Sequence, residues 1–557
     1  MDVGRDERSS LKTIHCRLPL QCVSPGEHTK PGRHGGLPEI VPPRRSRARS
    51  PHMSPALARD NRLGNTTVFW RASGLGRLPR GMVGVGLSFQ AGQQSGSPLR
   101  YSGMVSRLPS PKEERSIGML REMRQLAANC VAASVVFTCV FLVTTHSSAQ
   151  IQLSPNALAI YVSPAGNDTW SGKLPEPNAQ GTDGPLATVT GARDRVRTLK
   201  TEAAGRLTPI TVILRGGVYR QPETVVFTPA DSGTKAAPIT YQAWPGETPV
   251  ISGGTTVTGW QRDKGPHSKA HCGGKLWRLA VRKSTDGRRL AFNQLFVNGK
   301  RRTRARIPNR GAFLRTDGPT SSSSSRSFFF NEGDVKRWDN LRDVIFVLYH
   351  SWETSIHHIR SVDTESRRVV LREPAPWPMG RWEKRQRYYV ENVFEGLDEP
   401  GEWYLDRRAG VLYYYPLPGE KMDRIEVVVP TVVSTLIRLQ GNPAKGEFID
   451  GLHFKDVAFR HTNAELDRIR NPGQGEIYQP ALIMATGLRN SSFEACEVAH
   501  TGAHAIWMAE GCTDNRIGQC HLYDLNGGGV YIGGGWGIHE KHPAERITVD
   551  NCFIHEG

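Results

Sequence analysis

The C-terminal part of the sequence contains an internal repeat, and this repeat restricts the fold more than any other feature. When Cys496 is aligned with Cys520, 24 residues later, apolar residues coincide two, ten and twelve positions after each cysteine. Cys552 begins a further copy, displaced by an insertion at 533–544, and Val457 marks an earlier one. A period in the twenties is typical of a solenoid, in which each unit is stabilised by covering its neighbour.

The composition of the repeat favours one class of solenoid. Leucine-rich repeats need a regular leucine frame, which is missing here. Short β-branched runs separated by Gly, Asn and Asp bends indicate an all-β chain wound as a right-handed parallel β-helix, with the cysteines stacked inside as free thiols. Only five cysteines follow residue 149 and no C-x-x-C occurs, so we predict neither a zinc site nor a dense disulfide framework.

The mature sequence divides into three predicted parts. Strand-like runs separated by Gly, Pro and Asp clusters predict the first coils of the β-helix in residues 150–255, with one helix at 191–201. Residues 256–441 are richer in Trp, Tyr and Arg, and we interpret them as a β-rich, sandwich-like insertion. Residues 442–557 resume the coils and stop in mid-repeat, so we expect an incomplete β-helix that lacks further coils.

The N-terminal residues have a different character. Residues 1–118 hold 19 Lys and Arg against 8 Asp and Glu, out of a net charge of +19, and are rich in Pro, Gly and Ser. We predict a disordered extension, which we interpret as an over-extended reading frame. It lacks an aromatic-interleaved motif, so no nucleic-acid partner is predicted.

Residues 119–149 read as a secretory signal peptide. Arg121 precedes an apolar run at 126–143, and small residues at Ser147 and Ala149 precede the expected cleavage point. The prediction is a secreted or periplasmic protein with no stable membrane insertion after cleavage. A signal-anchor helix is the alternative, because the apolar run is nearly long enough to span a bilayer.

Several motifs carry a resemblance to a known family. They are Tyr161-Val-Ser-Pro-Ala-Gly-Asn-Asp168, Ile213-Leu-Arg-Gly-Gly-Val-Tyr219, Pro238-Ile-Thr-Tyr-Gln-Ala-Trp-Pro-Gly246, Leu295-Phe-Val-Asn-Gly299 and Gly401-Glu-Trp-Tyr-Leu-Asp406. The chain resembles the secreted right-handed parallel β-helix glycoside hydrolases of the β-xylosidase and α-fucosidase/xylanase type, truncated at the C-terminus. The resemblance implies a β-helix interrupted by a sandwich-like segment, and hydrolysis of glycosidic bonds in a polysaccharide.

One column of the repeat carries a titratable side chain in every copy. The residues four positions after each marker are His461, His500, Asp524 and Glu556. Neighbouring strands lie about 4.8 Å apart, close to the separation of about 5 to 5.5 Å between the carboxyls of retaining glycosidases. We therefore predict Asp524 and Glu556 as the catalytic carboxylates, and His461 and His500 as substrate-binding residues. The alternative is that the residues of this column only cap bends. In either case each strand must end at the residue before the column position, because otherwise the strand alternation would turn these side chains into the core.

Aromatic side chains supply further candidates. Trp507 and Tyr531 share the offset eleven positions after the cysteines, between inward-facing residues, so we predict an outward platform on which a sugar ring stacks. Simple filling of a strand surface explains them as well. His539-Glu-Lys-His542 lacks a third ligand and is interpreted as a loop, so no metal site is predicted.

The insertion holds a cluster that an inserted domain could contribute to a sugar site. It consists of His350, Trp352, His357 and His358, followed by Tyr389, Glu391 and Asn392. The simpler interpretation makes them ordinary strand residues of the insertion, and the sequence favours it.

Three functions remain open from the sequence. The first is hydrolysis of a polysaccharide by a two-carboxylate mechanism, by a monomer without cofactors. The second is a polysaccharide lyase on an acidic glycan, which needs a basic residue to take a proton. No Lys or Arg occupies the titratable column, which favours hydrolysis. The third is a non-catalytic carbohydrate-binding β-helix.

Overall fold

The computed structural model describes residues 156–202, 208–281, 292–321, 323–432, 434–466, 473–534 and 541–557. All of them belong to the unit Pro111–Gly557. The predicted extension 1–118 and signal peptide 119–149 lie outside the described residues, as do the first two residues of the motif His539–His542. No helix of the described ranges is long and apolar enough to cross a membrane.

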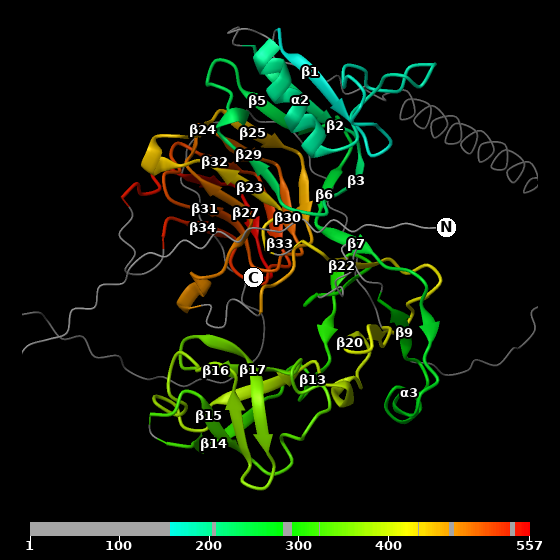
Figure 1. Cartoon of the computed structure of the whole chain (residues 1–557), viewed down its shortest axis with the longest axis vertical. Helices are drawn as coiled ribbons and strands as arrows, with labels where there is room; N and C mark the ends of the chain where they lie inside the picture. Colours follow the sequence, from blue (N-terminus) through cyan, green and yellow to red (C-terminus); the bar gives the residue numbers. More distant parts are fainter. Residues whose placement is uncertain are drawn as a thin grey trace, which may run out of the picture. The chain divides into compact units, whose positions relative to one another are not determined.

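Three parallel sheets, together called the coil stack, form the larger part of this unit, and the chain visits them in turn (Figure 1). Sheet A contains β1 (Leu158–Val162), β2 (Ile210–Leu214), β5 (Ile239–Ala243), β25 (Leu452–Lys455), β29 (Ser492–Glu494), β32 (Arg516–Gly518) and β35 (Thr548–Asp550). Sheet B contains β3 (Gly217–Arg220), β6 (Pro249–Ser252), β26 (Ala458–Arg460), β30 (Glu497–Ala499), β33 (His521–Tyr523) and β36 (Phe553–Ile554). Sheet C contains β4 (Val225–Phe227), β23 (Ile437–Gln440), β27 (Ala481–Thr486), β31 (His504–Met508) and β34 (Val530–Ile532).

The pairing register confirms the alignment of the sequence repeat. Val498 in β30 pairs with Leu522 in β33, which pairs in turn with Ile554 in β36. In sheet C, Ile506 pairs with Val530. Residues two dozen positions apart in the chain are therefore lateral neighbours, and the all-β class predicted from the sequence is correct.

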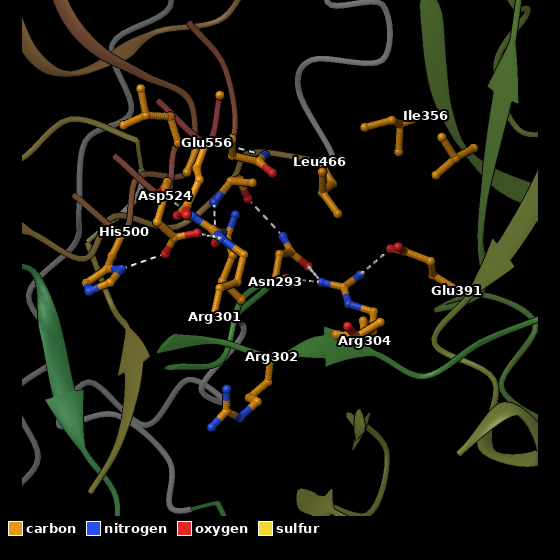
Figure 2. Close-up of a pocket in the computed structure, with 18 of the residues that line it drawn as sticks. Asn293, Arg301, Arg302, Arg304, Ile356, Glu391, Leu466, His500, Asp524 and Glu556 are labelled. Atoms are coloured by element: carbon orange, nitrogen blue, oxygen red, sulfur yellow. Dashed lines mark hydrogen bonds and ion pairs between the residues drawn. The ribbon is translucent and has the colours of Figure 1, made fainter. Parts of the chain in front are cut away.

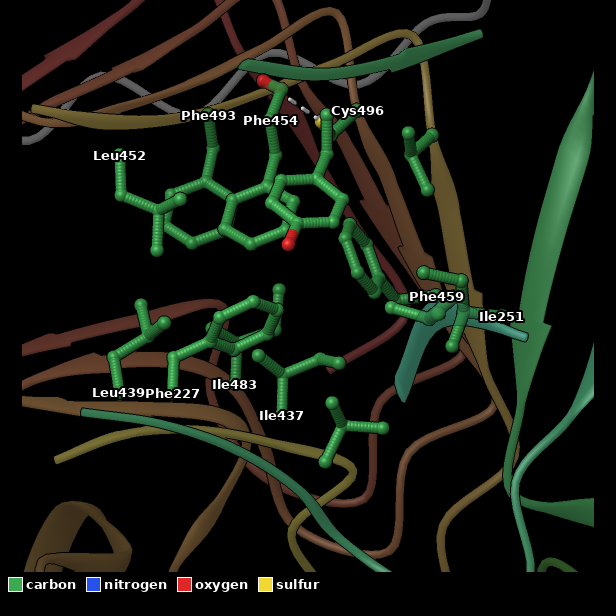
Figure 3. Close-up of a cluster of buried hydrophobic side chains, with 14 of the residues drawn as sticks. Phe227, Ile251, Ile437, Leu439, Leu452, Phe454, Phe459, Ile483, Phe493 and Cys496 are labelled. Atoms are coloured by element: carbon green, nitrogen blue, oxygen red, sulfur yellow. Dashed lines mark hydrogen bonds between the residues drawn. The ribbon is translucent and has the colours of Figure 1, made fainter. Parts of the chain in front are cut away.

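Aromatic rings stack inside the coils, and the thiol of Cys496 lies beside Phe454 (Figure 3). The rings of Tyr241, Phe454 and Phe493 follow one another in sheet A, with centroids 5.4 and 5.1 Å apart. Cys496 and Cys520 are buried and free, as the sequence predicted. Apolar side chains in equivalent positions of successive coils thus form a continuous core, which one coil could not build by itself.

A second group of strands, from β7 to β22, interrupts the coil stack and is called the insertion. One of its sheets contains β11 (Lys300–Arg301), β10 (Phe296–Val297), β22 (Val427–Pro430) and β7 (Gly254–Thr256). Another contains β12 (Thr303–Arg304), β20 (Glu402–Asp406), β21 (Val411–Tyr414), β9 (Trp277–Ala280) and β8 (Gln261–Arg262). The third contains β13 (Arg306–Ile307), β14 (Leu314–Pro319), β15 (Ser327–Phe330), β16 (Ile345–Tyr349), β17 (Thr354–Asp363), β18 (Arg368–Leu371) and β19 (Arg387–Glu391).

The predicted sandwich-like form of the insertion needs correction. Strand β19 pairs with β14 on one side and with β16 on the other, which closes strands β14 to β19 into a small antiparallel barrel. Strand β17 makes the closure possible, because a register shift between Ile359 and Ser361 lets it pair with β16 and then with β18. Such an irregularity bends a strand, and a closed barrel leaves no free sheet edge.

The remaining elements are short. They are α2 (Val189–Glu202), α3 (Pro266–His271), β24 (Ile449–Asp450), β28 (Leu488–Arg489), and the 3-10 turns η1 (Pro229–Asp231), η2 (Phe394–Gly396), η3 (Pro443–Lys445) and η4 (Gln474–Glu476). Helix α2 contains the helix predicted at 191–201. Strand β23 pairs with β4 and β27, so the chain re-enters the coil stack slightly before the predicted boundary at 441.

Candidate active site

The column of titratable residues lies where the strands of sheet B end. Strands β30 and β33 stop at Ala499 and Tyr523, and the next residue of each turns into the left-handed region. The φ angles of the four column residues are 66° for His461, 57° for His500, 49° for Asp524 and 54° for Glu556. A left-handed residue breaks the strand alternation, which otherwise would direct these side chains into the core. The condition set by the sequence, that the strand end one residue earlier, is met.

The carboxylate of Asp524 accepts hydrogen bonds from the side chains of Arg301 and His500 (Figure 2). The Nε of Arg301, from strand β11 of the insertion, donates to Asp524 Oδ1 at 2.7 Å. The Nδ1 of His500 donates to Oδ2 at 2.5 Å, because an ionised carboxylate only accepts. A second nitrogen of Arg301 donates to the backbone oxygens of Asp524 and Thr501. One arginine therefore fastens the insertion to two successive bends of the coil stack.

These contacts determine the charge of Asp524. Burial by itself raises the pKa of this carboxyl, but the hydrogen bond from His500 and the charge of Arg301 outweigh burial and hold the pKa below the ordinary 3.8. The side chain of Asp524 is 18% exposed, so it can still be reached from the cleft. It is thus an ionised carboxylate in a partly desolvated place.

The two predicted substrate-binding histidines have different surroundings. His500 lines the cleft but is buried, and it orients Asp524. His461 lies behind it, with its ring stacked on that of His500 at 5.0 Å and its Nδ1 bound to Ser252 Oγ at 2.9 Å. Burial, then the neighbouring His500 and Arg460, hold the pKa of His461 well below 6.5. His461 is absent from the cleft lining, so the structure separates it from the position expected for a sugar-binding side chain.

Glu556 lies one coil beyond Asp524, as the repeat predicted. The backbone N–H of Leu525 donates to the carbonyl of Glu556 at 2.8 Å, and both carboxylates line the same cleft (Figure 2). The side chain of Glu556 is 68% exposed, and its nearest ionic neighbour is His555 at 3.7 Å.

Trp507 and Tyr531 form a stacked pair, with ring centroids 4.7 Å apart and planes 18° from parallel. They belong to β31 and β34 of sheet C, in the register that the repeat predicted. Neither residue lines the cleft that contains Asp524. The structure therefore brings the two aromatics together but does not bring them to the predicted carboxylates.

The cleft itself has a volume of about 1120 Å³ and is bounded by the coil stack and the insertion. Its cationic lining residues are Lys300, Arg301, Arg302, Arg304, Arg306 and Arg310. Its acidic lining residues are Glu391, Glu465, Glu476, Asp524 and Glu556. Concave sites with a few convergent polar groups are the usual places for ligand binding.

Two of these acids are more desolvated than Glu556. Burial raises the pKa of Glu476, in turn η4 of the coil stack, above the ordinary 4.5. Burial also raises that of Glu391, although Arg304 and Arg306 oppose the shift. The Oε2 of Glu476 lies 3.0 Å from the place where a Cβ would be at Gly527, three residues beyond Asp524. The absence of a side chain at Gly527 thus lets Glu476 approach the bend of Asp524.

Of these two acids, only Glu391 was a candidate from the sequence, as a member of the cluster predicted in the insertion. Glu476 belongs to no motif, and its place in the cleft is apparent only in the folded chain. Tyr389 of that cluster lines the cleft as well. The histidines do not: His350 and His357 both bind Ser355 Oγ at 2.8 Å inside the barrel, away from the cleft lining.

The described part of the chain contains no group of three or more His, Cys, Asp or Glu that could hold a metal ion.

Comparison with known proteins adds a family match to this geometry. Residues 274–417 match the family model of the GH141 insertion domain. A solved structure described as a glycoside hydrolase aligns with a TM-score of 0.59 at 24% identity, over 72% of this chain and 73% of the other. A structure of XylC in complex with xylose aligns with a TM-score of 0.31 at 13% identity, over 66% of this chain and 54% of the other. No curated protein matches the chain. The match over 274–417 therefore lies within the insertion, and the first solved structure shares the fold.

Proposed function

We propose that this protein hydrolyses glycosidic bonds in a polysaccharide, using carboxyl groups of the cleft. The observation that carries the proposal is Asp524, a carboxylate kept ionised by Arg301 and His500 and facing a cleft that also contains desolvated carboxyls. Environments that push two pKa values apart provide an acid and a base at one pH. The GH141 match over the insertion supports the same chemistry, and the three-sheet coils support a right-handed parallel β-helix.

The roles of the carboxyls follow from their surroundings. Asp524, being ionised, attacks the anomeric carbon or activates a water molecule. The proton donor must stay protonated, which burial favours at Glu476, whereas the side chain of Glu556 is 68% exposed. We therefore assign the donor role to Glu476 and keep Glu556, chosen from the repeat, as the alternative. His500 positions Asp524 rather than the sugar.

The predicted binding and targeting roles complete the proposal. The stacked pair Trp507 and Tyr531 offers a face for a sugar ring on sheet C, as the sequence suggested. His461 supports His500 from behind. The signal peptide at 119–149 would direct the protein out of the cytoplasm. Polysaccharide substrates are accessible to a protein in that outer location.

The test measures release of reducing ends from a panel of soluble polysaccharides that includes arabinoxylan and homogalacturonan. Asp524→Asn should abolish release, and Glu476→Gln should lower it by about 10² to 10⁴-fold, the usual contribution of a positioned acid. Asp550→Asn, at an exposed carboxylate paired with Arg516 on sheet A, is the matched control and should act normally. Full activity of Asp524→Asn would contradict the proposal, and loss with Glu556→Gln but not Glu476→Gln would reassign the donor.

A lyase acting on an acidic glycan is the second candidate. The observation that favours it is the row of cationic residues along the insertion side of the cleft, because positive potential attracts an anionic chain. Arg301 is already engaged by Asp524 and so is a poor base. An unsaturated product that absorbs ultraviolet light would establish the lyase, and reducing ends without it establish the hydrolase.

A further inference from the structure

Three tryptophans of the insertion gather outside the cleft, and we call them the tryptophan cluster: Trp352, Trp377 and Trp382. Ring centroids are 4.4 Å apart for Trp352 and Trp382, 4.7 Å for Trp377 and Trp382, and 5.8 Å for Trp352 and Trp377. Trp352 is 45% exposed and Trp382 is 43% exposed. A single exposed apolar residue needs no explanation, but adjacent exposed indoles are a mark of a binding surface.

Polar groups surround and fix these rings. The indole N–H of Trp377 donates to the carboxylate of Glu353, and the guanidinium of Arg381 lies 4.8 Å from the ring centre of Trp382 and 5.7 Å from that of Trp377. The surface therefore combines aromatic faces with hydrogen-bonding groups. A sugar ring presents the complementary combination, apolar C–H faces edged by hydroxyls.

The cluster lies next to the proposed active site along the chain. Trp352 is in the turn between β16 and β17, and the residues that flank this turn, Tyr349 and Thr354, both line the cleft. Three residues of extended chain span at most about 11 Å. Trp352 is thus within a few residues of the cleft wall on both sides of its turn.

We propose that the tryptophan cluster is a second carbohydrate-binding surface, which holds the part of a polysaccharide chain that extends out of the cleft. This inference rests on the proposed function, since it takes the same substrate. A protein partner fits less well. Aromatic side chains bury about 150 to 250 Å² each, so two exposed indoles supply less than the roughly 800 Å² per partner of a specific protein interface.

The test uses the full chain carrying Asp524→Asn, which binds without cleaving, in affinity electrophoresis through gels that contain arabinoxylan or homogalacturonan. Adding Trp352→Ala and Trp382→Ala should weaken binding to the retained polysaccharide at least tenfold. Trp352→Phe with Trp382→Phe keeps aromatic faces and should restore most of the binding. Trp244→Ala is the matched control, because Trp244 also carries a stacked arginine, Arg215 at 4.7 Å, but lies in the first coils.

A second readout separates this inference from the proposed function. In a chain that keeps Asp524, the double variant Trp352→Ala/Trp382→Ala should have a KM for the long polymer that is several-fold higher. Its kcat/KM for a short oligosaccharide should be unchanged. Wild-type binding and KM in this double variant would overturn the second surface while leaving the cleft chemistry intact. No binding by Asp524→Asn, together with no product from the unsubstituted chain, would overturn both. Unchanged circular dichroism shows that the variants are folded.

Discussion

Replacement of Arg301 by methionine tests the contact on which the candidate site depends. Arg301 comes from the insertion, and its carboxylate partner Asp524 comes from the coil stack, 223 residues further along the chain. Methionine keeps much of the length of the side chain and removes its charge and donors. We predict that Arg301→Met destabilises the fold and that part of this effect disappears when Asp524 has already been replaced by asparagine.

The expected coupling follows from the burial of the pair. The side chains of Arg301 and Asp524 are 23% and 18% exposed, so they resemble neither a surface ion pair, at about 0 to 1 kcal/mol, nor a fully buried one, whose disruption costs about 3 to 5 kcal/mol. Asparagine still accepts a neutral hydrogen bond and tolerates a left-handed backbone. A double-mutant cycle of Arg301→Met and Asp524→Asn thus measures the difference between two hydrogen bonds. The bond to the charged carboxylate contributes about 1.5 to 3 kcal/mol, and the bond to the neutral amide contributes about 0.5 to 1.5 kcal/mol. We expect a coupling of about 1 to 2 kcal/mol.

The assay is urea unfolding of the two single variants, the double variant and the unsubstituted chain, followed by circular dichroism and tryptophan fluorescence. Coincident transitions identify one cooperative step. The control cycle pairs Asp524→Asn with Lys269→Met, since Lys269 is an exposed residue of helix α3 in the insertion and does not line the cleft. Its coupling should stay within about 0.5 kcal/mol. An equally small coupling for Arg301 would refute the reasoning.

Three other changes should alter stability in known directions. Glu402 is buried in the insertion, and burial, opposed by backbone N–H groups of Glu399 and Asp398, raises its pKa to about 7 from 4.5. The contribution of Glu402 to stability should therefore be complete below pH 4.5 and fall by about 3 kcal/mol as the pH rises to 7. Urea unfolding at several pH values should show this loss in the unsubstituted chain relative to Glu402→Gln. Ala495 has φ of 49°, so Ala495→Gly should raise the melting temperature through a gain of about 1 kcal/mol, whereas Ala499→Gly in strand β30 should lower it. Phe493→Ala should cost about 3 to 5 kcal/mol, because its ring is stacked on that of Phe454 in the preceding coil; a loss below 1 kcal/mol would show that the stacked rings contribute little.

The coils could be predicted because their information is local and repeated. The side-chain period of two within each strand, and the recurrence of Cys496 at Cys520, fix which residues face inward and which residues pair across coils. The same alignment places Asp524 at a strand end. Both conclusions need only the sequence of one coil and the next, and the pairing of Val498 with Leu522 confirms the register.

The insertion and the surroundings of Asp524 depend on contacts between distant segments. Barrel closure requires β19 to pair with both β14 and β16, and alternating patterns fit a sandwich equally well. Arg301 has no sequence signal that connects it with Asp524. Glu476 shows no motif either, and its raised pKa comes from burial that only the folded chain produces. The prediction thus located the carboxylate and missed what controls its charge.

The most direct test of this account is the titration of Asp524 itself. Carbon-13 NMR of the chain labelled at its aspartate carboxyls, with Asp524→Asn to assign the resonance, gives the pKa of this one group. The account predicts a midpoint below the ordinary 3.8, which moves upward in Arg301→Met. A midpoint at or above 3.8 in the unsubstituted protein would contradict it.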